Sequence, residues 1–191
     1  MSPTIIYFVR HAESLHTWKD DRTRPLTEAG LLDRVALLDY FKGIHIDAVY
    51  SSPYKRAYDT VAVLAETCQV LVQTDERLRE RKAGPDSNNR ALFIKRWENL
   101  EFAEAQGESI GMVQRRNIEC VAELTAGYAG KTIIVGTHGT ALASILRYYN
   151  QDYGFNDFMR ILNWMPYVVK AEYTQSVQIS EEFHIEKIYT A

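Results

Sequence analysis

The stretch Ile5-Ile6-Tyr7-Phe8-Val9-Arg10-His11 joins a short apolar run to a basic end. Its β-branched and aromatic residues are typical of a strand buried at the centre of a sheet. A second such run, Ile133-Ile134-Val135-Gly136-Thr137-His138, also ends on a histidine. In a parallel α/β sheet the carboxyl ends of the strands meet along one edge, and ligands bind outside that edge. We therefore expect His11 and His138 to share one site although they lie far apart in the chain.

Helices and strands are expected to alternate along the rest of the chain. Thr27 is a good helix N-cap, because its hydroxyl can accept a hydrogen bond from the free amides of the first turn. The apolar residues that follow it at helical spacing are Leu31, Leu32, Val35, Leu38 and Phe41. Further strands are expected over 47–51, 70–73 and 131–137, and edge strands between 167 and 189. Further helices are expected after Pro53, near 93–100, over 110–128 (begun by Ser109) and over 140–149.

This alternation of strands and helices implies βαβ units, a parallel sheet and helices on both of its faces. We predict an α/β fold, a three-layer αβα sandwich with a mainly parallel central sheet. No linker, repeat or low-complexity segment interrupts the pattern. A chain of 191 residues is long enough for one well-buried core and short for two. A single domain over residues 1–191 is therefore expected.

Composition excludes several classes of protein. The net charge of −3 argues against general nucleic-acid binding, which needs a basic face. The chain begins without a basic region, and its first apolar run is too short for a signal peptide or a membrane span, so a cytoplasmic protein with no membrane partner is expected. Cys68 and Cys120 are isolated in apolar stretches, which favours buried free thiols in a reducing compartment. No HExxH motif or Cys/His cluster predicts a metal site.

Three strand ends carry groups that suit a phosphate. In Arg10-His11, a neutral imidazole can attack phosphorus and the neighbouring guanidinium can bind phosphate oxygens. The segment 51–57 leaves the second strand and opens a helix, so backbone amides and Arg56 would face the same crevice. After the later strand, Gly139 would let the backbone approach a ligand, and His138 would stabilise transition-state charge. Arg10-His11 alone better fits a histidine at a strand end beside a surface arginine. The segment 51–57 fits a helix start and a surface arginine about equally well, and His138 alone fits a helix cap. The joint occurrence of the three favours a phosphoryl-transfer site.

A proton donor for the leaving group is expected in the charged run 75–80, which follows the third strand. Spacing alone does not separate Glu80 from Glu76, and Glu13 is a further alternative. Most such runs are solvated charges. The remaining histidines, His16, His45 and His184, lie in polar or terminal segments and carry no predicted role.

Five short motifs occur in an order typical of one family: 10–14 (Arg-His-Ala-Glu-Ser), 51–53 with Arg56, Ala57 and Thr60, 78–80, 107–109 and 137–139. The chain resembles the histidine phosphatase superfamily, with its phosphoglycerate mutase-like fold, from about Ile5 to about Leu146. The resemblance implies that His11 is a nucleophile that forms a phosphohistidine. It also implies that Arg10, Arg56 and His138 bind phosphate, that Glu80 gives and later takes a proton, and that no metal or organic cofactor takes part.

Three positions depart from the family pattern. Ala12 stands where the family usually has glycine, and a positive φ there would cost on the order of 1 kcal/mol. Thr17 stands where mutase-like members often have an asparagine that touches the phosphate. Thr17 and Gly139 are therefore also expected to bind phosphate. The segment after Glu80 lacks the Gly-x-Trp-Glu-Gly-like stretch that is common in the family.

The expected activity is metal-independent hydrolysis of a small-molecule phosphate monoester. A cofactor-dependent mutase is the first alternative, in which a sugar-acid hydroxyl replaces water as the acceptor. The segment between Glu80 and Gly107 is shorter than in such mutases, whose insertion helps to exclude water, and this favours a phosphatase. A catalytically dead phosphate-binding domain is the second alternative, and it would predict the loss of His11, Arg10, Arg56 or His138. The sequence specifies neither the substrate nor the oligomeric state.

Overall fold

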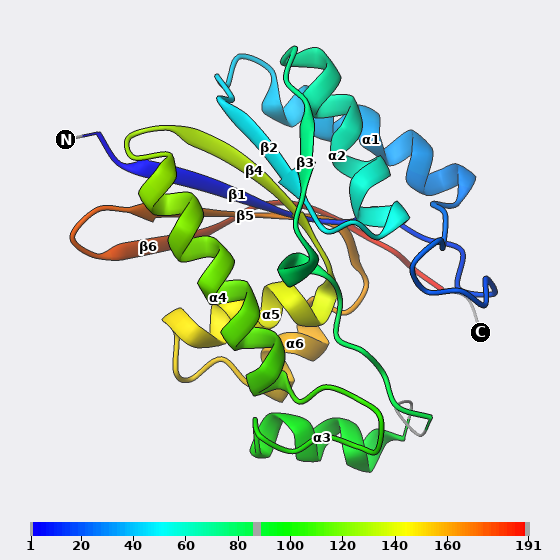
Figure 1. Ribbon diagram of the computed structural model, residues 1–191. Helices are drawn as coiled ribbons and strands as arrows, with labels where there is room; N and C mark the ends of the chain where they lie inside the picture. Colours follow the sequence, from blue (N-terminus) through cyan, green and yellow to red (C-terminus); the bar gives the residue numbers. More distant parts are fainter. Residues whose placement is uncertain (1, 86–88, 190–191) are drawn as a thin grey trace.

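The computed structural model describes residues 2–85 and 89–189. Within them, six strands form one sheet in the order β3-β2-β4-β1-β5-β6 (Figure 1). The strands are β1 Thr4–Arg10, β2 Ala48–Ser51, β3 Val72–Thr74, β4 Thr132–Thr137, β5 Trp164–Tyr173 and β6 Val177–Glu186. The first four run parallel, whereas β5 is antiparallel to both β1 and β6. The predicted α/β fold with a mainly parallel sheet is confirmed.

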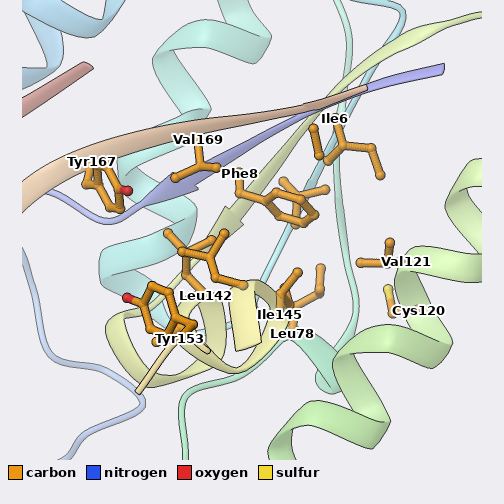
Figure 2. Packing of buried hydrophobic residues seen from close by; sticks show 14 of the residues in the cluster. Ile6, Phe8, Leu78, Cys120, Val121, Leu142, Ile145, Tyr153, Tyr167 and Val169 are labelled. Atoms are coloured by element: carbon orange, nitrogen blue, oxygen red, sulfur yellow. The ribbon is translucent and has the colours of Figure 1, made fainter. Parts of the chain in front are cut away.

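Helices cover both faces of this sheet. On one face lie α1 (Glu28–Phe41) and α2 (Lys55–Thr67), and on the other lie α4 (Ile110–Gly127) and α5 (Gly139–Tyr149). Successive side chains of a strand point to opposite faces. Accordingly, Tyr7 and Val9 of β1 join a core with Leu37 and Val61, whereas the core on the other face contains Phe8, seen beside Leu142 and Ile145 in Figure 2.

Three short elements complete the second layer. A 3₁₀ turn (Glu76–Leu78) follows β3 and packs on α4, and its Leu78 is fully buried in the core on that face of the sheet. Helix α3 (Arg90–Glu98) packs on α6 (Phe155–Arg160) through rings of Phe93 and Phe158 that lie 5.4 Å apart. The sequence pattern did not predict α6, which has only six residues.

Local capping follows the sequence, but the buried face of α1 does not. The Thr27 hydroxyl accepts from the amide of Gly30, as predicted. The apolar residues Leu32 and Val35 are nevertheless 72% and 58% exposed. At Gly30 a Cβ atom would lie 2.1 Å from the carbonyl oxygen of Glu13, so the helix turns its glycine toward the loop that follows β1. The buried residues of α1 are Gly30, Leu37 and Phe41, so only part of the predicted apolar stripe faces inward.

The tail forms strands, but only β6 lies at an edge. The expectation of edge strands is wrong for β5, which pairs with β1 along its length and is buried from Met165 to Val169. Cys120 is buried and Cys68 is partly buried, and both are free thiols. Among the described residues, no helix combines the length and apolar character that crossing a membrane requires.

Candidate active site

The sheet register brings three strand ends together. Arg10 of β1 lies opposite Thr137 of β4, and Ser51 of β2 lies opposite Gly136. The amide of the next residue, His11, donates to the Thr137 carbonyl at 3.0 Å. As a result, the rings of His11 and His138 lie 5.3 Å apart in an edge-to-face contact. The two histidines that are distant in sequence therefore share one site.

His11 is held in one tautomer. Its Nδ1 lies 2.7 Å from the carbonyl oxygen of Ala12, which can only accept, so Nδ1 carries the proton. Its Nε2 accepts a hydrogen bond from Nε of Arg56 at 3.2 Å. Burial lowers the pKa of His11 well below its ordinary value, and the charges of Arg56 and Arg10 lower that pKa further. The imidazole is therefore neutral near pH 7, with a lone pair on Nε2.

Ala12, the residue after His11, fits without backbone strain. Among the described residues other than glycine, positive φ angles occur at Gln69 and Gln106 and not at Ala12. The Ala12 amide donates to the hydroxyl of Thr60 at 3.0 Å, and its side chain is fully buried. The cost considered for alanine at this position therefore does not arise.

His138 lies behind His11 and is fully buried. Its Nε2 is 2.8 Å from the Ser52 hydroxyl, and its Nδ1 has no hydrogen-bond partner among the described residues. Burial, and then the charge of Arg56, holds the pKa of His138 well below its ordinary value. The second imidazole is thus also neutral and keeps one ring nitrogen free.

Arg10 extends across the start of α5. Its guanidinium donates to the carbonyls of Ile161 at 2.6 Å and Leu162 at 2.9 Å, while Nε has no partner among the described residues. A Cβ atom at Gly139 would lie 3.2 Å from the guanidinium carbon. The absence of a side chain at Gly139 therefore leaves the space that the Arg10 guanidinium occupies. Burial lowers the pKa of Arg10 to about 10, so the group remains charged at pH 7.

Arg56 comes from the first turn of α2, just beyond β2. Besides its bond to His11, it donates through NH1 to the carbonyl of Asp21 at 2.5 Å. Burial lowers its pKa to about 10, so this arginine also stays charged. Two guanidinium groups from different strand ends therefore flank one neutral imidazole.

Glu80 is the carboxylate that the fold brings to this site. Its oxygens accept from the amides of Thr140 at 3.0 Å and Ala141 at 3.2 Å, at the N-terminus of α5. Arg116 of α4 fixes the approach of this segment by donating to the Glu80 carbonyl at 3.1 Å. Glu76, in contrast, pairs with Arg22 in an exposed ion pair, and Glu13 accepts from the Thr27 hydroxyl.

These groups surround a pocket of about 360 Å³. Its titratable lining residues are Arg10, His11, His16, Arg24, Arg56, Glu80 and Tyr189, and the others are Ser14, Gly139, Leu162, Asn163 and Met165. His138 lies beneath this lining rather than on it. Thr17 is exposed and is not part of the lining, because the loop that carries it points toward solvent there. The placement of Thr17 does not match the phosphate contact expected of it.

Sequence reasoning missed Arg24 and His16. His16 has no predicted role because it lies in a polar loop, yet it lines the pocket, and its Nδ1 is 3.3 Å from NH1 of Arg24. Arg24 lies at the end of that loop, just before Pro25, and its positive charge is the feature of the sequence that could have indicated an anion-binding residue there. Burial lowers the pKa of Arg24 to about 10, and the charge of Arg56 contributes in the same direction. Within the described residues, no group of three or more His, Cys, Asp or Glu side chains is placed to hold a metal ion.

Comparison with known proteins identifies relatives of two kinds. The chain is 31% identical over 164 residues to a metal-independent phosphoserine phosphatase of Arabidopsis thaliana, covering 74% of this chain and 67% of that protein. It is 29% identical over 162 residues to a probable phosphoglycerate mutase GpmB of Yersinia pestis, covering 74% of this chain and 72% of the relative.

Solved structures share the fold. YhfR of Bacillus stearothermophilus superposes with a TM-score of 0.77 at 22% identity, covering 94% of this chain and 96% of that one. A phosphoserine phosphatase variant of Entamoeba histolytica in complex with phosphoserine gives a TM-score of 0.78 at 18% identity, with 94% and 96% coverage. Residues 6–177 match the family profile of the histidine phosphatase superfamily, branch 1, and this chain therefore belongs to that superfamily of phosphatases and mutases.

Proposed function

We propose that this protein is a metal-independent phosphomonoesterase that works through a phosphohistidine on His11. One observation carries the proposal: the Ala12 carbonyl fixes the proton on Nδ1, so that the Nε2 lone pair of a neutral, buried imidazole faces an arginine-lined pocket. A nucleophile held in this state needs no separate base, because the proton is already on the other nitrogen.

The first half-reaction transfers the phosphoryl group to the enzyme. Nε2 of His11 forms a bond to phosphorus while the bond between phosphorus and the ester oxygen breaks. Arg10 and Arg56 stabilise the negative charge of the phosphoryl oxygens, and His138 can donate a further hydrogen bond from beside His11. Glu80, in its acid form, gives its proton to the departing alkoxide.

The second half-reaction returns the free enzyme. Glu80, now a carboxylate, takes a proton from a water molecule that attacks the phosphorus. The bond between phosphorus and Nε2 breaks, and inorganic phosphate leaves. A mutase would follow the same first step and use a second hydroxyl of the bound substrate instead of water. The similarity to a phosphoserine phosphatase supports hydrolysis, and the similarity to a probable mutase makes transfer the second candidate.

Phosphate release in the presence of EDTA tests this proposal. The purified protein is incubated with p-nitrophenyl phosphate, O-phosphoserine and 3-phosphoglycerate, the last with and without 2,3-bisphosphoglycerate. We expect EDTA-resistant release of phosphate from at least one ester. Isomerisation of 3-phosphoglycerate without release of phosphate would replace the phosphatase with the mutase, and inactivity in every assay would favour a phosphate-binding domain.

The substitution Gly139→Ala is expected to raise KM several-fold with a smaller effect on kcat. The new methyl group would press on the Arg10 guanidinium, which two carbonyl bonds keep from moving away. A displaced guanidinium binds the phosphoryl group of the substrate less well. Steady-state kinetics measure the change. Gly127→Ala is the matched control, because a Cβ atom there would meet nothing within 4 Å, and equal kinetics of the two variants would contradict the assignment.

A further inference from the structure

The loop between β1 and α1 places Arg24, an arginine with no role in the proposed mechanism, in the same pocket as His11. Arg24 lines the pocket with a side chain that is only 19% exposed, and its Nε is buried without a partner among the described residues. With Arg24, the pocket has three arginines and one carboxylate in its described lining. Burial lowers the pKa of His11, His16 and His138, so the positive charge of the lining comes from the arginines, and its excess over the one carboxylate suits a phosphate dianion.

Arg24 and Arg56 share one carboxylate in the free protein. An oxygen of Asp21 lies 3.2 Å from NH1 of Arg56, and the same oxygen pairs with NH2 of Arg24. Two guanidinium groups repel each other, so an anion between them stabilises the arrangement. Asp21 supplies that anion from an exposed position, with 47% of its side chain accessible to solvent. Because Asp21 is accessible to water, its carboxylate can turn out to solvent when an anion of higher charge binds between the two guanidinium groups.

The arginine that contacts Asp21 also contacts the proposed nucleophile, His11. Arg56 donates through Nε to His11 and through NH1 to the backbone carbonyl of Asp21. Its NH1 and NH2 also lie 3.2 Å and 3.5 Å from the two oxygens of the Asp21 carboxylate, so this carboxylate engages the guanidinium before any substrate binds. A phosphoryl group at Nε2 of His11 needs donors of this same guanidinium. Substrate and Asp21 therefore compete for one set of N–H groups.

We propose that Arg24 is a third phosphate-binding arginine, and that the Asp21 carboxylate is a built-in competitor, which the phosphoryl group displaces from Arg24 and Arg56. The proposal deepens the proposed function and rests on it for the identity of the phosphoryl group. It predicts that removing the charge of Arg24 and removing the charge of Asp21 have opposite effects on phosphate affinity. Loss of Arg24 weakens phosphate binding, and loss of the Asp21 charge strengthens it.

Calorimetric titration with inorganic phosphate tests both effects without requiring turnover. We expect Arg24→Gln to raise the phosphate Kd about tenfold or more, the usual cost of a charged hydrogen bond. We expect Asp21→Asn to lower the Kd about threefold, because a negative charge near the anion is removed. Arg24→Lys, which keeps the charge, should fall between wild type and Arg24→Gln.

The same loop offers matched controls. Arg22→Gln removes a guanidinium that pairs with Glu76 outside the pocket, and Asp20→Asn removes a carboxylate that accepts from the backbone amides of Arg22 and Thr23 in its own turn. Both should bind phosphate like the wild type. The proposal is overturned if Arg24→Gln matches Arg22→Gln, or if Asp21→Asn binds phosphate no better than Asp20→Asn. If the wild type binds phosphate and hydrolyses no ester, the proposed function fails while these binding results still decide the inference.

Discussion

Replacing His11 with alanine is expected to lower kcat by at least about 10⁴-fold, because the variant has no group to accept the phosphoryl moiety. Hydrolysis of p-nitrophenyl phosphate in EDTA measures the rate. Protein labelled with phosphate from the substrate and quenched in base measures the covalent intermediate, since a phosphohistidine survives base and is lost in acid. The label should be present in the wild type and absent in His11→Ala.

His45→Ala is the control for this experiment. His45 is a surface histidine that pairs with Asp47 and lies outside the pocket, so its loss should change neither the rate nor the label. Phosphatase activity of His11→Ala within about tenfold of wild type would show that another group is the nucleophile. A label that resists acid would lead to the same conclusion, because it would not be a phosphohistidine.

Replacing Glu80 with glutamine is expected to slow hydrolysis by about 10²- to 10⁴-fold for an alkyl ester such as O-phosphoserine, the usual contribution of a general acid. The loss in the first half-reaction should be smaller for p-nitrophenyl phosphate, because p-nitrophenolate leaves without a proton. With that ester, the phosphohistidine should accumulate, since attack by water still requires a base. Pre-steady-state release of p-nitrophenol therefore shows a burst followed by slow turnover.

Glu76→Gln provides the comparison, because Glu76 lies in the same segment and is held by Arg22 outside the pocket. It should hydrolyse both esters at the wild-type rate. Equal losses for both esters in Glu80→Gln, with no burst, would indicate that Glu80 only anchors the start of α5 through Thr140 and Ala141. The proton donor would then have to be sought elsewhere on the pocket wall.

The strand ends were predictable because their signal is local. The apolar runs before His11 and His138 identify buried strands, and a parallel sheet aligns the carboxyl ends of its strands. The helix starts at Thr27 and Ser109 were predictable for the same reason, since each hydroxyl accepts from an amide three residues ahead. Periodicity and capping depend on residues a few positions apart, so both can be recognised directly in the sequence.

Positions that depend on the path of a loop were not predictable. The spacing of the charged run did not separate Glu80 from Glu76, and the amides of α5 that hold Glu80 lie some sixty residues further along the chain. Arg24 lines the pocket while Thr17 faces solvent, because the loop after β1 is tied to α2 through the carbonyls of Asp21 and Arg22.

Sequence alone thus determined the α/β architecture and the histidines and arginines that follow its strands, because short-range patterns encode both. Tertiary structure decided which carboxylate reaches the site, which loop residue joins the arginines, and which side of α1 is buried. Those outcomes depend on contacts between distant segments, such as Gly30 against Glu13 and Arg56 against Asp21. Such contacts form only when the chain has folded, so no local pattern in the sequence predicts them.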